Sequence, residues 1–83
     1  MTKVAEFSNS FLKNLKTLEH KKKEQVKIKI KQLLLDPKIG IPLKGTLRPL
    51  WKLRVGKYRV LYKFDKEKVY FVVLDLRKRA YKY

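Results

Sequence analysis

The chain has 83 residues, of which 23 are Lys or Arg and 7 are Asp or Glu, so its formal net charge is +16. The absence of cysteine excludes disulfides and thiolate metal sites, and the lack of a signal peptide or a long apolar run predicts a cytoplasmic protein with no membrane span. A charge this large predicts nucleic acid as one partner, and an acidic protein that masks the charge as a second.

The first elements predicted along the chain are a short strand and a helix. Residues 3–7 alternate weakly between polar and apolar side chains, as a strand does. Ser8 or Ser10 is suited to the N-cap of a helix over residues 9–18. The apolar positions of this helix recur at helical spacing: Phe11, Leu12, Leu15 and Leu18.

A second helix is predicted over residues 21–35. It ends at Asp36-Pro37, because the residue before a proline is pushed out of the helical region. The glycines and prolines of residues 38–48 then indicate a loop.

Three strands follow in an antiparallel meander, at about residues 49–55, 58–64 and 69–76. Apolar and basic residues alternate on both sides of Gly56-Lys57, which is typical of a hairpin with a two-residue turn. The elements together predict one α+β domain over the whole chain. It would consist of an N-terminal strand, a two-helix hairpin, the three-stranded meander and a short C-terminal tail.

Strand pairing predicts two chemically different faces of this meander. Counting outward from the first turn places Arg54 opposite Arg59, and counting through the second places Val60 opposite Val73. One face then carries the expected core: Trp51, Leu53, Val55, Tyr58, Val60, Tyr62, Phe64, Val69, Phe71 and Val73. The other face mixes cations with apolar residues: Lys52, Arg54, Arg59 and Lys63 beside Leu61, Tyr70, Val72, Leu74 and Leu76.

The opposed arginines are the most informative pair. Like charges directly opposite each other cost up to roughly 1 kcal/mol, so a sheet optimised for stability would avoid them. An anion lying between Arg54 and Arg59 would explain the pair. The mixed face therefore predicts a surface for RNA or a partner peptide, with a plain solvated face as the alternative.

Several short segments follow one another along the chain in an order that is known from other proteins. They are Leu34-Leu35-Asp36-Pro37, Pro42-Leu43-Lys44-Gly45, Trp51-Lys52-Leu53-Arg54, Gly56-Lys57-Tyr58-Arg59-Val60-Leu61-Tyr62, and Val72-Val73-Leu74 running into Arg77-Lys78-Arg79. With the preceding strand and helix hairpin, nearly the whole chain resembles the RelE/ParE toxin superfamily of prokaryotic toxin–antitoxin modules, and within it the RelE branch. The resemblance implies an endoribonuclease that cleaves mRNA in the ribosomal A site, inhibits translation, and is inactivated by an antitoxin that wraps it.

The resemblance also implies a basic active site made of Lys52, Arg54, Arg59 and Arg79. Tyr83 is the implied acid or base, and Tyr81 is its competitor. Attack of the 2′-hydroxyl on the adjacent phosphate builds negative charge on the phosphorane, which fixed cations stabilise without a metal or cofactor. Replacing such a cation is expected to stop cleavage and leave the fold intact, because the cations are expected to be exposed.

Further contacts are expected outside this set. Basic and aromatic residues that would contact RNA or the ribosome are Lys21, Lys22, Lys23, Lys44, Arg77, Lys78 and Tyr81. Background surface charge is the alternative for the lysines, and a frayed basic tail is the alternative for residues 77–83. Because Lys78 stands where many relatives have histidine, a histidine-based mechanism is excluded.

The expected antitoxin is acidic and RelB-like. It would bury either the neighbouring helix surface or the apolar residues of the mixed face: Leu61, Val72 and Leu74. Two other functions stay open on the same fold. One is a non-catalytic ParE-like inhibitor of DNA gyrase, and the other is a plain nucleic-acid-binding module.

Overall fold

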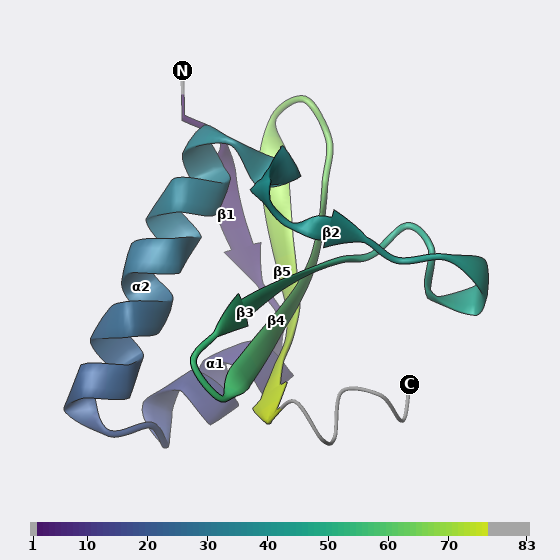
Figure 1. Cartoon of the computed structure of the whole chain (residues 1–83). Coiled ribbons are helices and arrows are strands. Elements are labelled where there is room, and N and C mark those ends of the chain that lie inside the picture. The colour runs from purple at the N-terminus through teal and green to yellow at the C-terminus, as the bar shows by residue number, and fades with distance from the viewer. Residues whose placement is uncertain (1, 77–83) are drawn as a thin grey trace.

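A five-stranded sheet carries two helices in the computed structural model, which describes residues 2–76 (Figure 1). The helices and strands are β1 (Val4–Phe7), α1 (Asn9–Lys16), α2 (His20–Leu35), β2 (Ile41–Pro42), β3 (Trp51–Val55), β4 (Tyr58–Phe64) and β5 (Lys68–Leu76). The strand order is β1-β5-β4-β3-β2, with β1 parallel to β5 and the other pairs antiparallel. The predicted α+β fold is confirmed.

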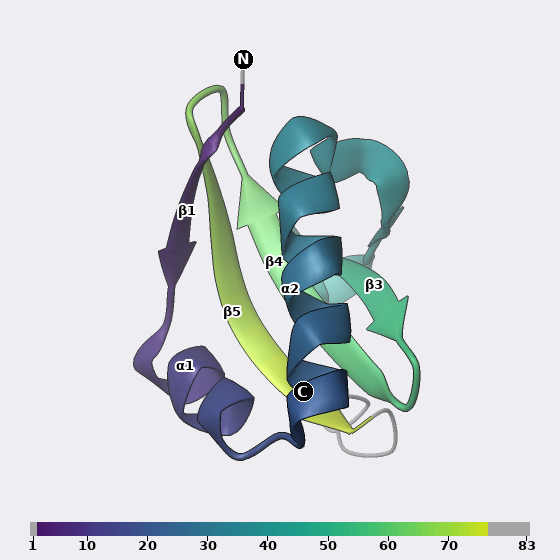
Figure 2. The ribbon, with the colours of Figure 1, turned by 90° about the vertical axis from the view of Figure 1, so that its left-hand side faces the viewer.

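Both helices cover one face of the sheet, as Figure 2 shows, and α1 is fastened to it by side-chain hydrogen bonds. The Ser8 hydroxyl caps α1 by accepting a hydrogen bond from the Phe11 N–H at 3.0 Å. The same hydroxyl donates to the Val72 carbonyl at 2.7 Å, and the Asn14 amide donates to the Leu74 carbonyl at 2.8 Å. These bonds explain why Ser8, rather than Ser10, is the N-cap of the helix.

The second helix ends where the sequence predicts. Its last residue is Leu35, and Asp36 takes an extended conformation before Pro37. Its inward side is buried through Val26, Ile30 and Leu33. No helix in the described part of the chain is long and apolar enough to span a membrane.

The core lies between the helices and the sheet. It is built around aromatic rings, with Phe71 placed 5.0 Å from Phe7, 5.6 Å from Phe11 and 6.4 Å from Tyr62 between ring centroids. The fully or nearly buried members of the core are Phe11, Val26, Ile30, Leu33, Val55, Val60, Tyr62, Val69, Phe71 and Leu74. Trp51 and Leu53 are half-buried against it, as expected for the predicted core face.

A bulge in β5 changes part of the predicted register. The pairing of β3 with β4 is confirmed, including Arg54 opposite Arg59. The register shifts between Leu61 and Tyr62, so that Val60 faces Leu74. The prediction that Val60 faces Val73 is therefore wrong, because Val72 is an extra residue in β5 and every later side chain moves to the opposite face.

The predicted loop contains two short helical turns and the two-residue strand β2. The chain packs closely against its neighbours at Gly40, just before β2. A Cβ on Gly40 would meet the Tyr62 hydroxyl and would lie 2.5 Å from the Lys52 carbonyl oxygen, so glycine is required there. The Tyr62 hydroxyl also donates to the Pro37 carbonyl at 2.6 Å and so anchors the loop to the core.

Candidate functional site

The face of the sheet opposite the helices is called the open face here. Because side chains alternate along a strand and opposed residues share a face, two rows cross it from β3 through β4 to β5. One row is Lys52, Leu61 and Val73. The next is Arg54, Arg59 and Asp75. Three of the four cations implied for the active site, Lys52, Arg54 and Arg59, therefore lie together.

The three cations differ in burial. Arg54 is exposed and Lys52 is half-buried, whereas Arg59 is only 2% exposed. The expectation that Arg59 is an exposed cation is wrong. A buried guanidinium is costly unless charged or polar groups surround it, so its retention on this face points to a use other than solubility.

The acidic member of the second row, Asp75, was not predicted from the sequence. In the predicted register Leu74 faces Arg59, and the bulge replaces it with Asp75. The half-buried Asp75 is the one acidic residue in β3, β4 and β5. The sequence did offer one indication of this acidic neighbour, because Asp75 is an acid near the end of an otherwise apolar and basic strand.

A hollow of about 320 Å³ adjoins these cations at the β2 side of the sheet. Its lining is Ile39, Gly40, Ile41, Lys52, Leu53 and Arg54. Arg54 therefore lines the hollow and also belongs to the row containing Arg59, and Lys52 of the neighbouring row lines the same hollow. Such an arrangement suits a phosphate group, because ammonium and guanidinium groups bind phosphate oxygens.

The other end of the open face has a different character. The Lys63 ammonium lies 5.6 Å from the centre of the Tyr70 ring, and the Tyr70 hydroxyl donates to Asp65 at 3.2 Å. The N–H groups of Lys68 and Glu67 also bind Asp65 and lower the pKa of its carboxyl group. Asp65 therefore stabilises the β4–β5 turn as a carboxylate, and we assign it no chemical role.

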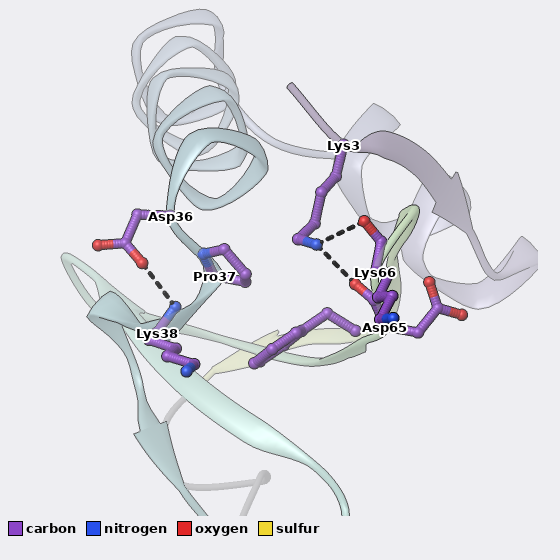
Figure 3. A pocket seen from close by; sticks show the side chains of 7 residues that line it. Lys3, Asp36, Pro37, Lys38, Asp65 and Lys66 are labelled. Carbon is purple, nitrogen blue, oxygen red and sulfur yellow. Dashed lines mark hydrogen bonds between the residues drawn. The ribbon is translucent and has the colours of Figure 1, made fainter. Parts of the chain in front are cut away.

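A larger hollow of about 450 Å³ lies beside this turn (Figure 3). Lys3 is one of the cations in its lining, and the Lys3 ammonium already donates to the carbonyls of Asp65 and Lys66 at 2.7 and 2.8 Å. Asp36 accepts a hydrogen bond from the Lys38 N–H at 3.1 Å. The Lys3 bonds fasten the N-terminal segment to the turn, so the cation and the acid named here have structural roles.

The residues expected to contact the antitoxin are placed differently from the prediction. Leu74 is 1% exposed and belongs to the core, and Leu61 is on the open face but only 2% exposed. The prediction that Leu74 lies on the mixed face is therefore wrong, whereas Leu61 lies on that face as predicted but is buried. Val72 is half-buried and borders a hollow of about 250 Å³ near Lys63 and Tyr70.

Two further groups do not join the cluster of cations. Lys21, Lys22 and Lys23 lie in the first turn of α2, on the side of the sheet opposite the open face. Lys44 is exposed in the loop after β2. The remaining predicted site residues, Arg77, Lys78, Arg79, Tyr81 and Tyr83, lie outside the described residues. Within residues 2–76, no three His, Cys, Asp or Glu side chains are grouped as a metal site.

Known structures share this fold closely. The RelBE2 toxin–antitoxin complex of Mycobacterium tuberculosis matches with a TM-score of 0.81 and 24% identity, over 93% of this chain and 100% of that one. An archaeal RelE–RelB complex from Pyrococcus horikoshii matches with a TM-score of 0.76 and 24% identity, over 95% of this chain and 99% of that one. A mutant of the Escherichia coli toxin RelE in the free state matches with a TM-score of 0.79 and 26% identity, over 98% of this chain and 90% of that one.

Sequence comparison places the chain in a family. No curated protein matches it. Residues 5–83 match the family described as the ParE toxin of the type II toxin–antitoxin system parDE. This match covers nearly the whole chain, and the matched folds are those of RelE toxins. The chain therefore belongs to the ParE toxin family, within the RelE/ParE superfamily, and is the toxin of a type II toxin–antitoxin system.

Proposed function

We propose that this toxin is a ribosome-dependent endoribonuclease that cleaves mRNA in the A site and so inhibits translation. The observation that carries the proposal is the grouping of Lys52, Arg54 and Arg59 on the open face, where Arg59 is buried. An inhibitor that only docks on a protein has no evident need for a buried cation beside two further cations. Because ribosomes are cytoplasmic, the proposal also places the toxin in the cytoplasm.

The proposed reaction is attack of an RNA 2′-hydroxyl on the adjacent phosphate, with release of the 5′-oxygen. The phosphorane gains negative charge in the transition state, and Lys52, Arg54 and Arg59 stabilise that charge more than they stabilise the ground state. Arg79 is proposed as the fourth cation. Tyr83 is proposed as the acid or base, with Tyr81 as the alternative, and a cationic surrounding would lower the pKa of either phenol toward neutrality.

Docking on the ribosome would use cations distant from the cleavage site. We propose Lys21, Lys22 and Lys23 for contacts with ribosomal RNA, because they are close together at the start of α2. Lys44, Arg77, Lys78 and Tyr81 are proposed as further RNA contacts. Contacts of this kind set affinity and its salt dependence rather than the rate of the chemical step.

The proposed antitoxin is an acidic, RelB-like protein. Acidity is supported by the charge of +16, which an acidic chain would partly neutralise. Since Leu61 and Leu74 are buried, the helix surface is the better-supported apolar contact. Ile28 and Leu35 lie seven residues apart on one side of α2 and are 56% and 72% exposed.

Inhibition of DNA gyrase is the second candidate, and one specific observation favours it. The family that matches residues 5–83 is named after the ParE toxin and not after RelE. Gyrase inhibition would need a protein-docking surface on the same fold, and it would not need the grouped cations. A plain nucleic-acid-binding module is the third candidate.

A paired assay distinguishes the candidates. Purified toxin would be added to ribosomes programmed with a defined mRNA, and separately to a gyrase supercoiling reaction. We expect cleavage of the mRNA at the A-site codon, no cleavage of the same mRNA without ribosomes, and normal supercoiling. Inhibition of supercoiling with intact mRNA would favour the ParE-like function, and binding of RNA with neither activity would favour the binding module.

A further inference from the structure

An acidic side chain lies within the candidate active site. On the open face Arg59 has Arg54 opposite it on β3 and Asp75 opposite it on β5. Directly opposed residues in antiparallel strands have Cβ atoms about 5 Å apart, so Asp75 is a nearest neighbour of Arg59. An acid beside a phosphate-binding cation is unfavourable for anion affinity unless it has a task of its own.

The placement of Asp75 depends on the β5 bulge. If the register of Tyr62 with Phe71 continued without the bulge, the side chain opposite Arg59 would be that of Leu74. Two hydrogen bonds from the α1 region fix the bulged segment, because Ser8 donates to the Val72 carbonyl and Asn14 donates to the Leu74 carbonyl. The fold therefore fixes the acid beside Arg59.

The burial of Arg59 indicates what the acid does. Arg59 is 2% exposed, and a buried guanidinium needs compensating charge or hydrogen bonds. Arg54 opposes this burial because it carries the same charge, whereas the Asp75 carboxylate favours it. A guanidinium is also planar and donates hydrogen bonds in fixed directions. A neighbouring carboxylate therefore limits its orientation and also compensates its charge.

We propose that Asp75 is a positioning residue that fixes the guanidinium of Arg59 for contact with the scissile phosphate. The proposal rests on the proposed endoribonuclease function. The alternative task for the same acid is to weaken RNA binding by repulsion. The two tasks predict opposite signs for the effect of removing the charge, because a repulsive acid slows cleavage and a positioning acid speeds it.

The first test is single-turnover cleavage on programmed ribosomes by the Asp75→Asn variant. We expect the rate at saturating ribosomes to fall about tenfold or more, with an unchanged half-saturating ribosome concentration. Asp75→Glu should recover part of the rate. Glu67→Gln is the matched control, since it removes the same charge from the exposed β4–β5 turn, and it should cleave at the parent rate. An Asp75→Asn variant that cleaves as fast as the parent, or faster, would overturn the proposal.

The second test is independent of activity. Thermal unfolding would be measured for Asp75→Asn, Arg59→Gln and the double variant. We expect Asp75→Asn to lower the Tm of the parent and to leave the Tm of Arg59→Gln unchanged, because the carboxylate acts through the guanidinium. Equal shifts in both backgrounds would refute the coupling. If the parent does not cleave mRNA at all, the proposed function fails, and this cycle alone then decides whether Asp75 positions Arg59.

Discussion

The two faces of the sheet use burial in different ways, and β4 shows the contrast within four consecutive residues. Val60 and Tyr62 point toward the helices, Arg59 and Leu61 point the other way, and all four are at most 2% exposed. On the helix face, burial removes apolar surface from water and stabilises the fold. On the open face, burial encloses a charge. The comparison indicates that the open face is not optimised for stability, and this is the expected mark of a site with a chemical task.

The largest expected effect is on the helix face. Phe71→Ala should lower the free energy of unfolding by about 3 to 5 kcal/mol, because a large buried ring is lost and a cavity remains. The loss would be measured by denaturant unfolding. Lys63→Ala is a control on the open face, where an exposed cation should contribute less than about 0.5 kcal/mol. Equal losses from both variants would break the contrast between the faces.

The next effect tests the buried cation. Arg59→Ala should slow single-turnover cleavage at least about a hundredfold, since a cation facing the phosphorane contributes roughly 3 kcal/mol. It should also lower the free energy of unfolding by at least about 1 kcal/mol, because Asp75 loses its opposed cation. This second effect departs from the sequence-based expectation of an intact fold. A stability equal to that of the parent would show that the burial of Arg59 has no structural consequence.

A smaller effect is expected where the core meets the loop. Tyr62→Phe keeps the ring and removes the hydroxyl that donates to Pro37, so a buried carbonyl loses its partner. The free energy of unfolding should fall by about 1 to 3 kcal/mol, measured by denaturant unfolding. Cleavage should be unaffected at saturating ribosomes. A large loss of cleavage would mean that the β2 loop takes part in the chemistry.

The same phenol predicts a pH dependence. Burial raises the pKa of Tyr62 to about 12, helped by the Asp36 carboxylate and opposed by the Gly40 N–H, whereas the ordinary value is 10.0. Its contribution to stability is therefore complete below pH 10 and is lost as the pH rises toward 12. Over this range the parent should lose stability more steeply than Tyr62→Phe. Parallel curves for the two proteins would refute a neutral, buried hydroxyl.

The smallest effect concerns the proposed docking lysines. Replacing Lys21, Lys22 and Lys23 with alanine should weaken ribosome binding roughly tenfold and reduce its salt dependence, while the rate at saturating ribosomes stays unchanged. The matched control replaces Lys27, Lys29 and Lys31, which changes the net charge equally farther along α2. Equal weakening in both variants would assign the effect to total charge rather than to a docking site.

The strands with strict alternation were predictable from the sequence. The β3–β4 hairpin, its register and the opposed Arg54 and Arg59 follow from alternation around a two-residue turn. The end of α2 follows from Pro37. In β5 the run Val69 to Leu74 has no polar residue except the Tyr70 hydroxyl, so either register buries apolar side chains, and the bulge has no signal in the pattern.

The candidate site was predictable in part. Alternation placed Lys52, Arg54 and Arg59 on one face, but it carries no information on how deeply each side chain is buried. The role of Asp75 depends on the bulge, and that bulge is fixed by hydrogen bonds from Ser8 and Asn14, more than fifty residues away in the chain. Strand β2 is too short for any periodic pattern.

The most direct test of whether the row of Arg54 and Arg59 is the site of cleavage compares two exposed cations of the open face, Arg54 and Lys63. Single-turnover cleavage of mRNA on saturating programmed ribosomes would be measured for the parent, Arg54→Ala and Lys63→Ala. We expect a loss of about a hundredfold or more for Arg54→Ala and the parent rate for Lys63→Ala. Equal rates for all three proteins would contradict it, because the row of Arg54 and Arg59 would then not be the site of cleavage.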